Sequence, residues 1–239
     1  MRRILSSAAV VCLTLAGFTS TASAATITLD ATSRGYFRSD GTVAGSHGTA
    51  GANYLAGQYQ TREYRNFFIF DLSSVAGLIV SASLQIAPGD YLSADSSETV
   101  TLFDVSTPFA SLTNGTGSVA AFNDLGSGTS FGSRAFTAAD VWTVPVTMAL
   151  NGAALTNLQS AVGALFAMGG AVTSIGGGAD QTVFGATHLA GGLPVRLVLE
   201  TQAEEPPPTP AVPEPATLTL LGTGLFACAS SRWRRRSRA

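Results

Sequence analysis

The feature that most limits the fold is a set of short segments in which apolar and small polar residues alternate. In residues 80–86, an apolar residue occupies every second position, with serines and a glutamine between. Successive side chains of a β-strand point to opposite faces, so this segment predicts a strand with one buried face. That face would carry Val80, Ala82, Leu84 and Ile86.

Similar alternation occurs in residues 99–105, 144–148 and 195–200, and residues 27–29 would open the domain. Pro145 cannot donate a backbone hydrogen bond, so we expect its strand at an edge or a bulge. Residues 66–70, Asn-Phe-Phe-Ile-Phe, are apolar at neighbouring positions. A strand that is buried on both faces has this composition, so residues 66–70 predict a central strand.

One segment has helical spacing. Its apolar residues follow the three-to-four-residue repeat of one helix face, after a possible N-cap at Asn151 and before a possible stop at Gly169-Gly170. These residues are Leu155, Leu158, Val162 and Leu165. Residues 39–53, 112–132 and 175–179 are rich in Gly, Ser, Thr and Asn and are expected to be loops.

Together, these patterns predict an all-β, mainly antiparallel fold, a single jelly-roll-like β-sandwich with one short helix. Residues 25–203 would form this domain, which is long enough for one hydrophobic core. They contain six arginines and twelve acidic residues, a formal charge of −6. This charge gives no electrostatic support for binding nucleic acid. Cys12 and Cys228 both lie in the terminal apolar segments, so the domain has no disulfide.

The N-terminus has the composition of a secretory signal peptide. Arg2 and Arg3 precede an apolar stretch at residues 4–18, and Ala22-Ser23-Ala24 fits the small-residue cleavage rule through Ala22 and Ala24. We expect residues 1–24 to be removed during export, leaving Ala25 at the mature N-terminus.

The C-terminus carries three consecutive features. A Pro/Glu-rich spacer at residues 204–211 leads to Val212, Pro213, Glu214 and Pro215, and an apolar run follows at residues 216–231. As a helix this run would span about 24 Å, somewhat less than a bilayer core of about 30 Å. An arginine cluster completes the chain: Arg232, Arg234, Arg235, Arg236 and Arg238. Arginines resist translocation, so the helix would span the membrane with these arginines in the cytoplasm.

This order of motif, apolar helix and arginine cluster in residues 212–239 resembles the PEP-CTERM sorting signal of Gram-negative bacteria. The resemblance implies processing by an exosortase, a membrane-embedded cysteine transpeptidase, near the Pro-Glu-Pro motif. It also implies transient anchoring in the membrane, delivery to the cell surface or beyond, and a host that makes exopolysaccharide. The alternative is a plain tail anchor, which would keep its arginines in the mature protein.

A second resemblance concerns the domain itself. Residues 65–75 combine an arginine, an apolar strand ending in Phe-Asp-Leu and a short turn, before the strand at residues 80–86. Together with residues 193–199, this segment resembles DNRLRE-type jelly-roll domains. That resemblance implies a jelly roll, and some members of the family bind polysaccharides.

Candidate catalytic and metal-binding residues are few. His47 and His188 lie in Gly-rich segments, where loop positions are expected; a zinc site needs about three or four good N or S ligands, and the domain offers two histidines and no cysteine. Asp71 and Asp104 could act as paired carboxylates on a glycosidic bond, although an aspartate after an apolar strand more often caps a turn. Calcium prefers hard oxygen ligands, and one segment offers three of them or, alternatively, a solvated turn. These three residues are Asp90, Asp95 and Glu98.

Tyrosines and arginines mix between residues 36 and 65. Exposed tyrosine rings stack on sugars, and arginine binds carboxylate or sulfate groups, so these residues are a candidate glycan face. They include Tyr36, Arg38, Tyr59, Arg62 and Tyr64. The alternative is that the tyrosines are half-buried strand positions and that the arginines pair with acidic residues.

The sequence therefore favours an exported surface or matrix protein without enzymatic activity or cofactor, in possible contact with exopolysaccharide. One alternative is a polysaccharide lyase or hydrolase with Tyr64 or His47 as base. Another is a passive structural protein.

Overall fold

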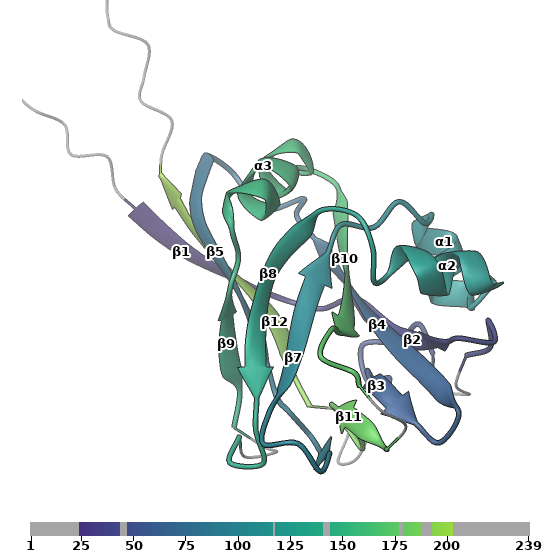
Figure 1. Cartoon of the computed structure of the whole chain (residues 1–239). Coiled ribbons are helices and arrows are strands. Elements are labelled where there is room, and N and C mark those ends of the chain that lie inside the picture. The colour runs from purple at the N-terminus through teal and green to yellow at the C-terminus, as the bar shows by residue number, and fades with distance from the viewer. Residues whose placement is uncertain are drawn as a thin grey trace, which may run out of the picture. The chain divides into compact units, whose positions relative to one another are not determined.

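The structure is a computed structural model that describes residues 24–43, 47–116, 118–140, 144–176, 179–187 and 193–202. Within these ranges the chain forms mostly antiparallel β-structure with short helices (Figure 1). The elements, in chain order, are β1 (Ala24–Asp30), β2 (Ser33–Arg38), β3 (Ala56–Tyr59), β4 (Arg62–Asp71), β5 (Leu78–Ile86), β6 (Tyr91–Leu92), β7 (Glu98–Phe103), α1 (Phe109–Asn114), α2 (Ser118–Asp124), β8 (Ser130–Phe136), β9 (Val146–Ala149), α3 (Gly152–Ser160), β10 (Leu165–Val172), β11 (Gln181–Val183) and β12 (Val195–Gln202).

The strands form two antiparallel sheets. The smaller sheet has the order β1-β12-β5-β9, and the larger has the order β6-β11-β3-β4-β10-β7-β8, with β2 paired to β4. The strand after Pro145 is β9, at the edge of the smaller sheet, as predicted. The first and last of these strands, β1 and β12, pair from Ala24↔Gln202 to Asp30↔Arg196.

A shared core joins the two sheets. Leu84 and Leu197 of the smaller sheet belong to the same buried cluster as Phe68, Phe70 and Leu102 of the larger. The predicted central strand, residues 66–70, is confirmed as part of β4 and is fully covered on both faces.

The second face of β4 is covered by helices. Phe67 and Ile69 belong to a separate buried cluster with Leu112 near α1 and with Phe122 and Leu125 around α2. Figure 1 shows α1 and α2 lying together beside β2 and β4. The two faces of one strand therefore contribute to two hydrophobic clusters.

The predicted strand at residues 80–86 is confirmed, but its inward face differs at one end. Val80 is 38% exposed, whereas Ala82, Leu84 and Ile86 are buried. Glu200 pairs with Ser81 and Thr201 pairs with Ile79, so β5 has one residue more than β12 at this bulge. That extra residue is Val80, and the bulge turns it away from the core.

The predicted helix begins as expected and ends early. Asn151 caps α3 by accepting a hydrogen bond from the Ala154 amide at 3.1 Å. The helix ends at Ser160, followed by Gly163 with a φ of +84°. The expected extension to Gly169 is wrong, because residues 165–172 form β10, which pairs with both β4 and β7.

The expectation of a loop at residues 112–132 is also wrong. This segment contains the end of α1, all of α2 and the start of β8. The helices form here because the outer face of β4 and β10 is apolar. Leu112, Phe122 and Leu125 pack there, and apolar burial stabilises short helices that would not form alone.

Candidate functional site

A cleft of about 260 Å³ opens where β7 ends and β10 begins. Its walls come from residues 104–109, the start of β8, the C-terminal half of α3 and the first residues of β10. Figure 1 shows α3 across this end of the sheets, with α1 and α2 to one side. The cleft therefore depends on segments that are distant in sequence.

The apolar part of the cleft is aromatic. Phe131 and Phe166 stack with ring centroids 5.9 Å apart and an interplanar angle of 23°. Both are buried, but Phe109 and Leu165 are 38% and 42% exposed. The cleft thus combines a fixed aromatic wall with apolar side chains that a ligand can cover.

The polar part of the cleft offers mainly hydrogen-bond acceptors. The hydroxyl of Ser160 donates to the Thr156 carbonyl oxygen at 2.9 Å, and the hydroxyl of Ser106 donates to Asp124 at 2.7 Å. Asn157 donates to the Ala153 carbonyl oxygen at 3.0 Å, which leaves its Oδ1 and one N–H available. Both serine oxygens keep lone pairs for a ligand.

Asp104 contributes the charged group of the cleft. Its Oδ1 accepts the Thr129 amide at 2.6 Å, and no described residue donates to its Oδ2. The Asp104 amide also donates to the Thr129 carbonyl oxygen at 3.0 Å. These paired bonds hold the carboxylate in place, so one oxygen stays available to a ligand.

Asp124 fixes one wall of the cleft. It accepts the amide and hydroxyl of Ser106 at 2.9 and 2.7 Å, and those of Thr107 at 2.7 and 2.6 Å. Burial alone would raise the pKa of Asp124, but the bonds from Thr107 and Ser106 outweigh it and lower the pKa. The segment before α1 is therefore tied to α2 before any ligand binds.

The cations of the domain are largely committed elsewhere. No arginine is among the described residues that line the cleft. Four ion pairs hold arginines at 2.7–2.9 Å from carboxylates: Arg62–Asp40, Arg65–Glu63, Arg134–Asp140 and Arg196–Asp30. A further arginine, Arg34, is 1% exposed and donates to the carbonyl oxygens of Ala52 and Leu193.

The candidate glycan face is only partly accessible. Tyr36 and Tyr64 are each 7% exposed, and their rings meet edge to face with centroids 5.4 Å apart. Arg38 lies 6.0 Å from both ring centroids. These two tyrosines are buried in paired strands, Tyr36 in β2 and Tyr64 in β4.

Tyr59 and Arg62 remain at the surface, opposite each other in the β3–β4 pairing. The ring of Tyr59 is 40% exposed. Arg62 pairs with Asp40 at 2.8 Å, so an acidic sugar would have to compete with this carboxylate.

The calcium candidates are used in a different way. Glu98 is fully buried and accepts bonds from Ser93 at 2.6 Å, from Ser174 and from the Gln181 amide at 3.1 Å. The same amide nitrogen donates to Asp95 at 2.6 Å. Gln181 therefore bridges the two carboxylates.

Asp90 takes no part in that bridge. It is exposed, and its backbone carbonyl accepts the Phe184 amide at 3.0 Å. Among the described residues, no group of three or more histidine, cysteine or acidic side chains could hold a metal ion.

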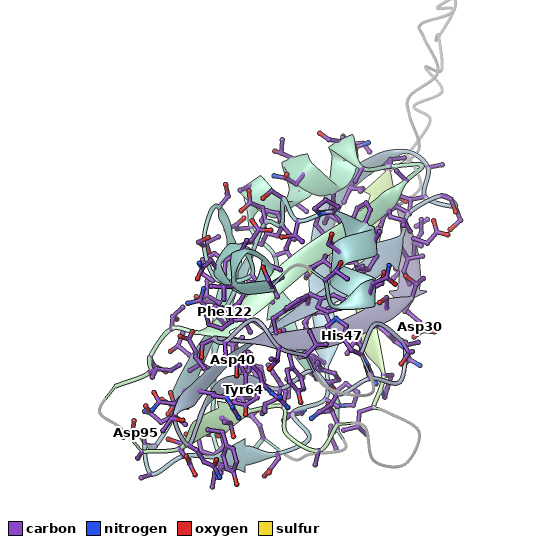
Figure 2. The ribbon with its side chains drawn as sticks, turned by 90° about the vertical axis from the view of Figure 1, so that its right-hand side faces the viewer. Asp30, Asp40, His47, Tyr64, Asp95 and Phe122 are labelled. Atoms are coloured by element: carbon purple, nitrogen blue, oxygen red, sulfur yellow. The ribbon has the colours of Figure 1, made fainter. Side chains whose placement is uncertain are left out.

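His47 lies against aromatic rings. Its ring centroid is 5.1 Å from that of Phe37 and 5.2 Å from that of Phe67, and Nε2 bonds the Leu112 carbonyl oxygen. Burial lowers the pKa of His47 and favours the neutral ring. In Figure 2, Asp95 lies well apart from His47, so these two predicted candidates do not form one site. His188 lies outside the described residues.

The two carboxylates considered for glycosidic chemistry have separate roles. Asp71 accepts the Ser73 amide at 2.9 Å, a turn cap that also lowers the pKa of Asp71. Asp104 belongs to the cleft. The other polar residues of the cleft, Ser106, Asn157 and Ser160, were not anticipated from the sequence, which offers no motif for them.

Most of the predicted targeting residues lie outside the described residues. These are Ala22, the motif Val212, Pro213, Glu214 and Pro215, and the terminal arginines. Ala24 is the first residue of β1 and is exposed. No helix in the described part of the chain is long and apolar enough to cross a membrane.

Comparison with protein families identifies the C-terminal segment. Residues 211–236 match the PEP-CTERM protein-sorting motif. No curated protein matches the chain. The resemblance of residues 65–75 and 193–199 to DNRLRE-type domains is not supported by any match. The sorting motif implies export, processing by exosortase and sorting to the cell surface.

Proposed function

We propose that this protein is a non-enzymatic component of the cell surface or extracellular matrix that contacts exopolysaccharide through its β domain. The observation that carries the surface location is the PEP-CTERM motif at residues 211–236. A signal peptide at residues 1–24 would direct export, and exosortase would then remove the tail near Pro213 and Pro215.

The register of β1 and β12 suits removal of both ends. Ala24 pairs with Gln202, so the N-terminal and C-terminal extensions leave the domain at the same pair of residues. Cleavage after Ala24 and in the segment at residues 204–215 would leave both sheets almost intact. The domain can therefore be released from the membrane with its core unchanged.

The strand order supports a jelly-roll sandwich. With the strands β1, β4, β5, β7, β8, β9, β10 and β12 numbered one to eight in chain order, the small sheet has the order 1-8-3-6. The matching part of the large sheet has the order 2-7-4-5. Two four-stranded sheets with these alternating crossovers make an eight-stranded jelly roll, and β2, β3, β6 and β11 extend it.

Processing is tested by following the tail in the native host. The wild-type protein should be recovered at the surface or in the medium with a mass that lacks the arginine cluster and residues 1–24. A variant with Pro213, Glu214 and Pro215 changed to alanine keeps the apolar run and the arginines, and it should stay in the membrane at full tail length.

A deletion of residues 213–239 separates anchoring from export. The truncated protein keeps the signal peptide, so it should be exported, and it lacks the apolar run that would anchor it in the inner membrane. Recovery of the wild-type chain with both ends intact in the cytosol would refute the proposed route.

A further inference from the structure

We infer that the cleft between α3, β10 and the segment at residues 104–109 binds a neutral sugar unit and rejects acidic sugars. This inference deepens the proposed contact with exopolysaccharide and rests on that proposal for its biological setting. The binding chemistry follows from the cleft itself, so it can be tested without reference to sorting.

The first argument is the hydrogen-bonding character of the cleft. The hydroxyl hydrogens of Ser106 and Ser160 are committed to Asp124 and to Thr156. What these side chains offer a ligand is oxygen lone pairs, and Asp104 adds a carboxylate oxygen without a described donor. Sugar hydroxyls donate hydrogen bonds, so a ring with several hydroxyls can satisfy these acceptors together.

Asn157 adds a hydrogen-bond donor to the acceptors of the cleft. After its bond to the Ala153 carbonyl oxygen it retains an acceptor and one N–H. A sugar hydroxyl both donates and accepts, and a side-chain amide matches this pairing. The cleft volume of about 260 Å³ lies below the usual range of about 300–1,000 Å³ for larger ligands, so one sugar unit fits better than a buried chain.

The second argument is the aromatic surface. Phe109 lines the cleft and is 38% exposed, and Phe131 and Phe166 form the aromatic wall. The C–H face of a pyranose ring is apolar and can cover an exposed phenyl ring, which removes both surfaces from water. Polar acceptors beside an exposed ring favour a sugar over a purely apolar ligand.

The third argument is electrostatic exclusion. Asp104 would lie close to any uronate carboxylate in the cleft, and no arginine among the described lining residues could neutralise it. Residues 25–203 carry a formal charge of −6, and four of their six arginines pair with carboxylates. An unpaired like charge opposes binding and acts as a specificity element.

A small cation is the competing ligand for Asp104. Its Oδ1 already accepts the Thr129 amide at 2.6 Å, and the remaining polar groups lie on separate elements. An ammonium group only donates hydrogen bonds and cannot accept the remaining N–H of Asn157, whereas sugar hydroxyls both donate and accept. We therefore assign the cleft to a neutral sugar.

The test uses the exported protein purified from its host. Isothermal titration would compare neutral glucose and mannose oligosaccharides with oligouronates of equal length and with a simple alkylamine. We expect binding only to neutral oligosaccharides, and we expect Phe109→Ala to weaken it about 5- to 10-fold. Leu92→Ala is the control, since Leu92 is 43% exposed but does not line the cleft.

Asp104→Asn tests the exclusion of acidic sugars. Removing the charge should lower the preference for neutral over acidic oligosaccharides at least about threefold. Preferential uronate binding, amine binding alone, no binding at all, or equal effects of Phe109→Ala and Leu92→Ala would each overturn the inference. Thermal unfolding of every variant would show whether lost binding reflects lost structure. Normal sorting alongside any of these results would leave the proposed location intact.

Discussion

Replacing the buried Gln181 of β11 with alanine should destabilise the domain. The amide nitrogen of Gln181 donates to Asp95 at 2.6 Å and to Glu98 at 3.1 Å, and its oxygen accepts the Gly176 amide at 2.9 Å. Gln181 is 2% exposed and Glu98 is fully buried. The side chain thus connects β11, β7 and the turn after β10.

The expected loss follows from these three bonds. A buried bond to a charged group contributes about 1.5–3 kcal/mol, and a neutral one contributes about 1 kcal/mol. Because Asp95 is exposed, water can replace its bond at little cost. The bonds to Glu98 and Gly176 then give about 3 kcal/mol, which for a domain of this size lowers Tm by about 6–12 °C.

Urea unfolding followed by circular dichroism would measure the change on the purified exported protein. Gln85→Ala is the matched control, because Gln85 is a partly exposed residue of β5 without a described side-chain bond, and it should change stability by less than about 0.5 kcal/mol. A loss below about 1 kcal/mol for Gln181→Ala would show that Glu98 does not depend on the bridge.

Further expectations concern other contacts. Gln181→Glu would put a third carboxylate between Asp95 and Glu98, so it should destabilise the domain and be partly rescued by millimolar calcium in thermal unfolding. Asn151→Ala removes the cap of α3 and should cost about 1 kcal/mol in urea unfolding, with Asn114→Ala as control. Gly170→Ala would place a Cβ 2.3 Å from Asn66 Oδ1, so it should lower Tm, whereas Gly152→Ala meets no atom within 4 Å and should not. Burial lowers the pKa of His47 below 6.5, so between about pH 7 and pH 5 the unfolded state binds more protons than the folded state. The stability of the domain should therefore fall as the pH falls through this range. His47→Gln should lose less stability over that range, and equal losses would contradict the assignment.

The sequence correctly predicts the strands in which the pattern of apolar residues follows the burial of the side chains. Residues 99–103 and 195–200 alternate because one face of each strand meets the shared core. Residues 66–70 do not alternate because helices cover the second face of β4. In each case local composition follows burial, so a single segment contains enough information.

The sequence does not predict β10, because its glycines are required by contacts with other parts of the chain. Gly169 and Gly170 suggest the end of a helix, but they lie inside a strand between β4 and β7. A Cβ at Gly169 would lie 2.6 Å from the Leu125 carbonyl oxygen, and a Cβ at Gly170 would lie 2.3 Å from Asn66 Oδ1. Both positions need glycine because other parts of the chain approach the strand, which local sequence does not reveal.

The same distinction separates the two functional features of the chain. The sorting motif is a continuous segment recognised by its order of residues, so residues 211–236 suffice to identify it. The cleft needs α3 to lie across the end of the larger sheet, which brings Asn157 to the same hollow as Asp104, 53 positions earlier in the sequence. The sequence indicates Asp104 only as one member of a carboxylate pair, whereas its neighbours in the cleft are hydrogen-bond acceptors and phenyl rings. Surface delivery can therefore be inferred from a linear motif, whereas what the domain contacts there depends on tertiary structure.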